Sequence, residues 1–352
     1  MAAMNQVPRV ASVATAVPGH VLHQAEVAVG AAELFAPDVP GFERLSPVYA
    51  NAAIERRHSC VPIDWYQRSH SFAERNALYI ENAVDLLERV ARQATAEAGL
   101  DLMDIDGLVV VSTTGIATPS LDALLIERLA LRRDIQRLPV FGLGCAGGVI
   151  GLSRAAQLAI SRPDARFLFL VVELCGLTFR SNDRTKSNII ATALFGDGAA
   201  GAVISCATDG PAILGWGEHT WPNSLDVMGW DVRDDGLAVV FSQDIPTIVR
   251  TRMRDAAARF LDGHGLGFRD IDDFVCHPGG AKVLDALEEI FDLQPGDLDH
   301  SRGVLRDFGN MSAVTVMFVL RRALAAASVG DRQLLSSLGP GFTAGFMLLE
   351  AA

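Results

Sequence analysis

The sequence predicts an α/β fold with parallel strand pairing and an internal duplication. Apolar strands alternate with helical segments along the chain, two long segments repeat in register, and the composition is typical of a large packed core. Of the 352 residues, 50% are hydrophobic and 20% are charged, which excludes a disordered chain. The net charge of −12 argues against a nucleic-acid-binding surface, and no segment is long and apolar enough to span a membrane.

The first copy of the repeat contains three predicted elements around one cysteine. Residues 99–110 form an aspartate-rich turn followed by an apolar strand. Residues 140–152 lead from a strand through small residues around Cys145 into a nearly apolar helix. Residues 167–174 are an apolar run that carries one charge, at Glu173, and are typical of a buried strand.

The second copy repeats this pattern about 166 residues later, so we interpret the chain as two related halves. The first half, residues 1–210, carries the cysteine, and the second half is residues 211–352. In α/β folds, functional side chains gather where strands lead into helices. The matched segments are 99–110 with 265–276, 143–146 with 308–311, and 164–169 with 330–335.

Three side chains with acyl-transfer chemistry lie at such junctions. Cys145 and Asn310 occupy equivalent junctions of the two halves, and His277 follows the predicted strand 273–276. Taken singly, they have structural alternatives: a buried apolar cysteine, a core histidine and a helix N-cap. Together they indicate a thiolate nucleophile with a pKa lowered by a helix N-terminus, an imidazole that activates it, and an amide that donates to an enolate oxygen.

Five motifs around these residues resemble those of the type III polyketide synthases, the chalcone synthase-like enzymes of the thiolase superfamily. The resemblance extends from about Pro8 to Glu350. It implies the five-layered αβαβα thiolase fold, a homodimer, and no metal or bound cofactor. The motifs are Gly144-Cys145-Ala146-Gly147-Gly148, Leu194-Phe195-Gly196-Asp197-Gly198, His277-Pro278-Gly279-Gly280, Gly309-Asn310-Met311-Ser312 and Gly339-Pro340-Gly341-Phe342-Thr343.

The resemblance also implies a reaction and its substrates. An acyl group passes from coenzyme A to Cys145, malonyl-CoA loses carbon dioxide, and His277 and Asn310 hold the enolate that attacks the cysteinyl thioester. Several segments look like the bacterial alkylpyrone and alkylresorcinol synthases, which implies a fatty acyl starter. Trp230 stands where plant enzymes have glycine and opposes this assignment.

The family's cavity positions carry over to further residues of this sequence. Phe195 matches a gatekeeper phenylalanine, Val239 stands where plant enzymes have a second one, and Thr118 matches a loop residue that reaches the partner's cavity. The phosphates of coenzyme A need local cations in an acidic chain, and Arg57 and Lys282 are the candidates. The other expected substrate-binding positions are Cys175, Thr178, Gly280 and Ser312.

Two other functions stay open at the level of the sequence. A β-ketoacyl-acyl carrier protein synthase III has the same three residue types, but performs one condensation with a carrier protein and usually has a different turn after the histidine. A non-catalytic thiolase-fold partner subunit is the alternative from another class, although such proteins typically lose the nucleophile. Starter length, number of extensions and the mode of cyclisation are not determined by the sequence.

The cysteines and the start of the chain predict a cytoplasmic protein. The five cysteines form no CxxC pair, which is typical of a reducing compartment. The first residues lack the charged and apolar regions of a signal peptide.

Overall fold

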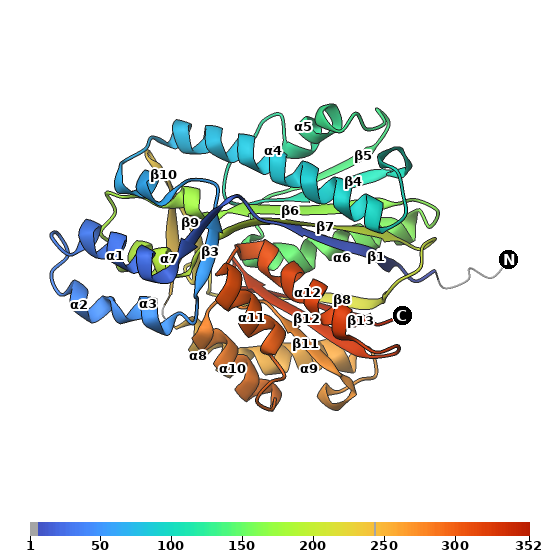
Figure 1. Ribbon diagram of the computed structural model, residues 1–352. Helices are drawn as coiled ribbons and strands as arrows, with labels where there is room; N and C mark the ends of the chain where they lie inside the picture. The colour runs from blue at the N-terminus through green and yellow to red at the C-terminus, as the bar shows by residue number, and fades with distance from the viewer. Residues whose placement is uncertain (1–5, 243) are drawn as a thin grey trace.

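The computed structural model describes residues 6–242 and 244–352, and its centre is a mixed β-sheet (Figure 1). The pairs β4–β5, β4–β6 and β11–β12 are parallel, and the other neighbours in the sheet are antiparallel. The nine strands of the sheet lie in the order β11 (Asp273–Cys276), β12 (Arg332–Gly339), β13 (Thr343–Glu350), β8 (Ala212–Thr220), β1 (Arg9–Ala16), β7 (Asp197–Ser205), β6 (Phe167–Leu174), β4 (Gly107–Val111) and β5 (Gln136–Val140).

Helices form three layers that alternate with the two parts of this sheet (Figure 1). The outer helix α4 packs on β1, β6 and β7, and on the opposite side α9 packs on β8 and β13. The central helices α6 and α12 contact strands of both parts. This order confirms the predicted five-layered αβαβα arrangement. The helices are α4 (Phe72–Glu97) and α5 (Leu121–Arg128), then α6 (Gly147–Ser161) and α12 (Thr315–Ala326), then α9 (Arg254–Asp262), α10 (Ala281–Phe291) and α11 (Asp299–Phe308).

The internal duplication is visible in repeated hydrogen bonds. Before β4 and β6, the Asp106 N–H donates to the Arg166 carbonyl (2.8 Å) and the Arg166 N–H donates to the Asp106 carboxylate (2.9 Å). Before β11 and β12, Asp272 and Arg332 repeat both bonds at 2.9 and 2.8 Å. Both residues of the second pair lie 166 positions after their counterparts. The predicted duplication is therefore confirmed in the details of the backbone.

The two predicted halves, 1–210 and 211–352, meet in the connection between β7 and β8. Their sheets join at a short seam, where β1 and β8 share one register pair, Arg9 with Ala212. Two backbone hydrogen bonds flank it, from Val10 to the Pro211 carbonyl (2.9 Å) and from Ile213 to the Pro8 carbonyl (2.8 Å). The division into two units stays a prediction.

The centre of the core lies where α6 meets the start of α12. Helix α6 is buried along most of its length, as its apolar sequence predicts. A Cβ atom at Gly148 would lie 2.3 Å from the Ala313 carbonyl oxygen, so glycine is required for α6 to approach the short 3-10 helix η7 (Ser312–Val314) this closely. This contact brings the first half's Cys145 next to the second half's Ser312.

A lobe of shorter elements lies at one end of the sheet, at the left of Figure 1. It includes a two-stranded hairpin that is separate from the central sheet. None of the helices in the described ranges is long and apolar enough to cross a membrane. The elements of the lobe are α1 (Gln24–Phe35), α2 (Phe42–Leu45), α3 (Pro47–Asn51), α7 (Lys186–Leu194), β2 (His20–His23), β3 (Arg56–Ser59), β9 (Met228–Arg233) and β10 (Gly236–Phe241). The short helix α8 (Ile245–Ile248) follows the hairpin.

Candidate active site

The structure brings Cys145, His277 and Asn310 to one cavity of about 470 Å³. Cys145 lies in the 3-10 turn before α6, His277 follows the end of β11, and Asn310 precedes η7. The convergence predicted from the duplication is therefore present. The two junctions differ in one respect. Asn310 forms a β-bridge with Phe195 and lies two residues before η7, whereas Cys145 lies within its own 3-10 turn.

The thiol of Cys145 is partly exposed to the cavity and donates to the Ser312 hydroxyl, with 3.5 Å between sulfur and oxygen. Burial raises its pKa to about 11, opposed in part by the hydrogen bond to Ser312. The sequence predicts a lowered thiol pKa from the helix N-terminus, but in the unliganded protein burial has the larger effect. Formation of the thiolate therefore depends on a nearby base or cation.

His277 provides an imidazole in the same cavity. Its backbone N–H donates to the Ser336 carbonyl (2.8 Å), which continues the pairing of β11 and β12 and fixes the residue at the strand end. Burial lowers the pKa of the ring to about 4, so the free enzyme holds it neutral. Neither ring nitrogen has a hydrogen-bond partner within residues 6–242 and 244–352. A buried imidazole without partners is available to a substrate.

The amide of Asn310 is fixed from two sides. Its nitrogen donates to the Gly279 carbonyl (3.0 Å), and its oxygen accepts from the Ser312 N–H (2.8 Å). The Asn310 backbone N–H donates to the Leu194 carbonyl (2.8 Å). Because the oxygen is occupied by a backbone donor, the side-chain orientation is determined and the NH₂ group faces acceptors. The second N–H of that group can serve a substrate oxygen.

Replacing His277 with alanine is expected to move the reaction of Cys145 with iodoacetamide to higher pH. Burial raises the pKa of Cys145 to about 11 while the imidazole is neutral, and an imidazole that accepts the proton as the thiolate forms offsets this cost. The labelling rate at pH 7.5 should fall by about tenfold or more, since one pKa unit corresponds to tenfold. Mass spectrometry of the Cys145 peptide from pH 6 to 10 measures this. His264→Ala, which removes an exposed imidazole, is the control, and identical profiles for both variants would contradict the pairing.

Glu173 is a buried carboxylate beside this site that sequence reasoning did not assign to it. One oxygen accepts from the Thr113 N–H (3.0 Å), and the Thr113 hydroxyl accepts from the Gly144 N–H (3.2 Å), directly before Cys145. Burial raises the pKa of Glu173 to about 7. Its other oxygen has no partner in the described part of the chain. The available signal was a single charge in the otherwise apolar strand β6.

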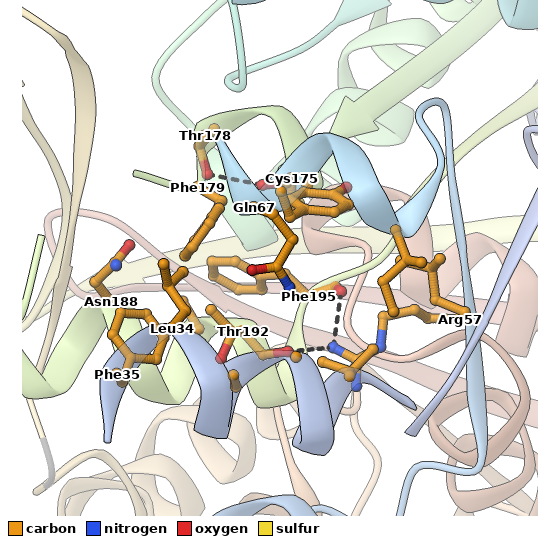
Figure 2. Close-up of a pocket in the computed structure, with 18 of the residues that line it drawn as sticks. Leu34, Phe35, Arg57, Gln67, Cys175, Thr178, Phe179, Asn188, Thr192 and Phe195 are labelled. Carbon is orange, nitrogen blue, oxygen red and sulfur yellow. Dashed lines mark hydrogen bonds between the residues drawn. The ribbon is translucent and has the colours of Figure 1, made fainter. Parts of the chain in front are cut away.

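Figure 2 shows a second, apolar cavity, of about 80 Å³. Five of the predicted substrate-binding residues line it: Phe195, Cys175, Thr178, Val239 and Arg57. Figure 2 shows Leu34 and Phe35 of α1 on the opposite wall, with Phe179 beside them. Sequence reasoning missed the wall formed by α1, because nothing in its sequence distinguishes a cavity wall from a core face.

Arg57 does not lie at the mouth of the first cavity. The structure therefore contradicts the prediction that it contacts the phosphates of coenzyme A. Its side chain is 3% exposed and donates to the carbonyls of Thr192 (2.6 Å), Ala193 (3.1 Å) and Phe195 (3.2 Å), as Figure 2 shows in part. These carbonyls lie at the C-terminal end of α7, where a cation is favoured. The cause is strand alternation in β3, which turns Arg56 outward and Arg57 inward.

The mouth of the first cavity carries both lysines of the chain, Lys186 and Lys282. Lys282 lies in the first turn of α10, two residues after Gly280, which also lines the cavity. Arg44 is a third basic residue of this lining and was not singled out from the sequence. A protein of net charge −12 thus concentrates cations at this opening.

Thr118 lies on the loop between β4 and α5, and its peptide bond to Pro119 is cis. It is not among the residues that line either cavity within the described chain. Ile116 of the same loop and Phe141, which follows β5, are 48% and 61% exposed. The structure of one chain therefore leaves the expected contribution of Thr118 to a cavity as a prediction.

Family models match both halves of the chain. The N-terminal domain of the chalcone and stilbene synthases matches residues 61–208, and their C-terminal domain matches residues 217–352. A putative chalcone synthase of Bacillus subtilis is 36% identical over 96% of this chain and 97% of its own length. A 1,3,6,8-tetrahydroxynaphthalene synthase of Streptomyces peucetius is 38% identical over 97% of this chain and 92% of its own.

The fold also matches a solved structure. The 1,3,6,8-tetrahydroxynaphthalene synthase of Streptomyces coelicolor, described as a bacterial type III polyketide synthase, superposes with a TM-score of 0.93 and 28% identity, covering 97% of this chain and 99% of that one. The cavity with its cysteine, histidine and asparagine, the five-layered fold and these matches agree. The chain belongs to the chalcone and stilbene synthase family and is a type III polyketide synthase, an acyl-transferring enzyme.

Proposed function

We propose that this enzyme condenses a fatty acyl-CoA starter with malonyl-CoA on Cys145, His277 and Asn310 and cyclises the product to an alkylpyrone or alkylresorcinol. The observation that carries this proposal is the apolar second cavity, which is lined by Phe195 and by aliphatic and aromatic side chains of α1. Val239 and Ala31 leave space there that larger side chains would fill. An alkyl chain fits such a lining, because its transfer from water is favourable.

The first half-reaction loads the starter. The Cys145 sulfur attacks the thioester carbonyl of the starter, and His277 accepts the thiol proton. The carbon–sulfur bond to coenzyme A breaks, and the leaving thiolate takes up a proton.

The second half-reaction extends the chain by two carbons. Malonyl-CoA loses carbon dioxide, and the electron pair of the broken bond forms an enolate whose oxygen accepts hydrogen bonds from His277 and Asn310. The enolate carbon attacks the thioester on Cys145, and the cysteine sulfur leaves. Each round consumes one malonyl-CoA and releases one carbon dioxide. These steps use only the groups named here and coenzyme A, so we propose that no metal or bound cofactor is needed.

The cations at the mouth of the first cavity suit the phosphates of both thioesters. Lys282 and Arg44 line it together with Lys186. Phosphate binding by lysine and arginine is strong where the charges converge. We propose that these three residues, rather than Arg57, contact coenzyme A.

A ladder of acyl-CoA starters with malonyl-CoA, read by mass spectrometry, tests the proposal. Gly30 of α1 lines the second cavity, and a Cβ atom there would lie 3.0 Å from the flexible end of Gln67. Gly30→Phe should therefore fill this space and lower kcat/KM for a twelve-carbon starter by about tenfold or more relative to a four-carbon starter. Val29→Phe, at a neighbouring position that is 60% exposed, is the matched control. Equal length profiles for the two variants would place the alkyl chain elsewhere.

The names of the relatives favour a second candidate, the synthesis of a polyphenol such as tetrahydroxynaphthalene. The ten ring carbons of that product can all come from two-carbon units, so no alkyl starter is required. Incubation with malonyl-CoA alone separates the two candidates. A naphthalene-type product formed without any starter would favour the second one.

We also propose that the enzyme is a cytoplasmic homodimer. Support for the dimer comes from β5, an edge strand of the sheet, and from the exposed side chains of Ile116 and Phe141. Support for the location comes from the five cysteines, all of which are free thiols. A monomer in light scattering at micromolar concentration would contradict the dimer.

A further inference from the structure

The β9–β10 hairpin separates the two cavities. Met228 and Phe241 line the first cavity, and Val239 lines the second. Val239 pairs with Trp230, and Phe241 pairs with Met228, so all four side chains lie on one face of the hairpin. The ring of Phe195 lies 5.7 Å from that of Phe241 and 6.4 Å from that of Trp230. Phe195 and this face of the hairpin therefore lie at the boundary between the two cavities.

The hairpin is not part of the central sheet, so its position depends on side-chain contacts. It forms a two-stranded sheet of its own, packed against α7 and the 3-10 helix η4 (Cys175–Thr178). A two-stranded hairpin is marginally stable by itself. Contacts at its turn, residues 234–235, therefore have a large influence on where the strands lie.

An ion pair connects this turn to the segment that follows the wall of the second cavity. Two nitrogens of Arg180 contact the two carboxylate oxygens of Asp235, at 2.9 and 2.8 Å, and Asn182 donates to the same carboxylate at 3.2 Å. We call Arg180, Asn182 and Asp235 the hairpin clamp. The Arg180 side chain is 10% exposed and that of Asp235 is 33% exposed, so the pair is largely shielded from solvent. A bidentate pair of this kind fixes orientation as well as distance.

The clamp is continuous with the lining of the second cavity. The Arg180 carbonyl accepts from the amide of Asn188, which lines that cavity, and Arg180 also pairs with Asp183 at 2.9 Å. Its neighbour Phe179 lines the cavity too. Beyond the turn, Gly236 lies against the buried Arg75, where a Cβ atom would be 2.9 Å from a guanidinium nitrogen. Movement of the turn would therefore change the relation between β10 and the cavity wall.

We propose that the hairpin clamp is a specificity-determining element, which holds the β9–β10 hairpin close to Phe195 and so limits the length of acyl chain that passes into the second cavity. This inference rests on the proposed function for its substrate. Arg180, Asn182 and Asp235 line neither of the two cavities, so they act as positioning residues. Loss of the clamp lets the hairpin move away from Phe195 and admits longer chains.

Asp235→Asn removes the charge of the clamp at nearly constant shape. We expect the ratio of kcat/KM for a twelve-carbon starter to that for a four-carbon starter to rise by about fivefold or more, since pocket discrimination of this kind is worth one to two orders of magnitude. The matched control is Asp231→Asn, which breaks the exposed Arg233–Asp231 pair (2.9 Å) in the same hairpin. In this control, the ratio of kcat/KM for the twelve-carbon starter to that for the four-carbon starter should stay within about twofold of the wild-type value.

A second readout does not depend on condensation. Alkylation of Cys145 by N-alkylmaleimides of increasing chain length measures passage of an alkyl chain directly, by mass spectrometry of the Cys145 peptide. Asp235→Asn should raise the rate with long-chain relative to short-chain reagents, and Asp231→Asn should not. If the wild type forms no condensation product, the proposed function fails while this comparison still tests the clamp.

Arg180→Lys distinguishes loss of the clamp from a folding defect, because it keeps the charge and loses the bidentate contact. It should shift both ratios in the same direction as Asp235→Asn. Far-ultraviolet circular dichroism and the Tm identify which variants are folded. If folded Asp235→Asn and Arg180→Lys both keep the wild-type length ratios within about twofold, the clamp is merely structural and the proposal is overturned.

Discussion

Replacing Cys145 with alanine is expected to stop product formation, with a loss of at least about a thousandfold in kcat, the order seen when a catalytic nucleophile is removed. Cys145 is the cysteine that lines the same cavity as His277 and Asn310. Without its sulfur, no acyl intermediate forms, and the enolate has no thioester to attack. Product mass spectrometry measures the loss, and intact-protein mass spectrometry should show acylation of the wild type but not of the variant.

Cys206→Ala is the matched control for this substitution. Cys206 follows β7, is partly exposed, and its thiol contacts only backbone carbonyls, of Gln6 and Ala159, in the described residues. This variant should keep its activity. Acylation of Cys145→Ala at another cysteine, with product still formed, would show that the nucleophile has been assigned wrongly.

Arg57→Met is expected to lower the free energy of unfolding by roughly 3–5 kcal/mol, because a buried cation that bonds three carbonyls is replaced by a side chain without donors. The carbonyls of Thr192, Ala193 and Phe195 then lose their partner at the end of α7. Since the Asn310 N–H bonds to the neighbouring Leu194 carbonyl, the asparagine should shift as well. Urea unfolding measures the stability, and kcat of the folded fraction measures the shift.

Arg56→Met is the control, because it changes the adjacent residue of the same strand. The Arg56 side chain is 52% exposed and reaches Asp307 at 3.6 Å, which is a weak surface pair. Its loss should cost less than about 1 kcal/mol. Equal destabilisation by the two substitutions would show that Arg57 has no special part in holding the end of α7.

Much of the fold could be predicted from the sequence, because the same order of strands and helices occurs in both halves of the chain. The three pairs of matched segments in register predict the duplication, and the apolar residues 147–161 predict the buried helix α6. The short seam between β1 and β8 could not be predicted, since one register pair leaves no pattern in the sequence. The lobe around α1 could not be predicted either, because its helices are short and only weakly amphipathic.

The catalytic residues could be predicted from their residue types, whereas residues whose orientation depends on packing could not. Cys145, His277 and Asn310 stand at strand–helix junctions, and their residue types already indicate acyl transfer. Arg57 shows the limit: in a strand, a shift of one position exchanges the inward and outward faces, so Arg56 and Arg57 cannot be told apart without the structure. The contact between Asp235 and Arg180 could not be predicted for another reason: the two residues are 55 positions apart in the sequence.

The central place of β1 in the sheet has a consequence for synthesis of the chain. Its register pairs with β7 run from Arg9 with Ser205 to Ala16 with Ala199, more than 180 residues later. At roughly 5–20 residues per second, a nascent chain holds this strand without its neighbour for about 10 to 40 seconds. During that time the strand exposes an open edge, which is the kind of surface that aggregates. The central strand of the sheet is thus the first made and the one separated from its partner by the longest stretch of chain.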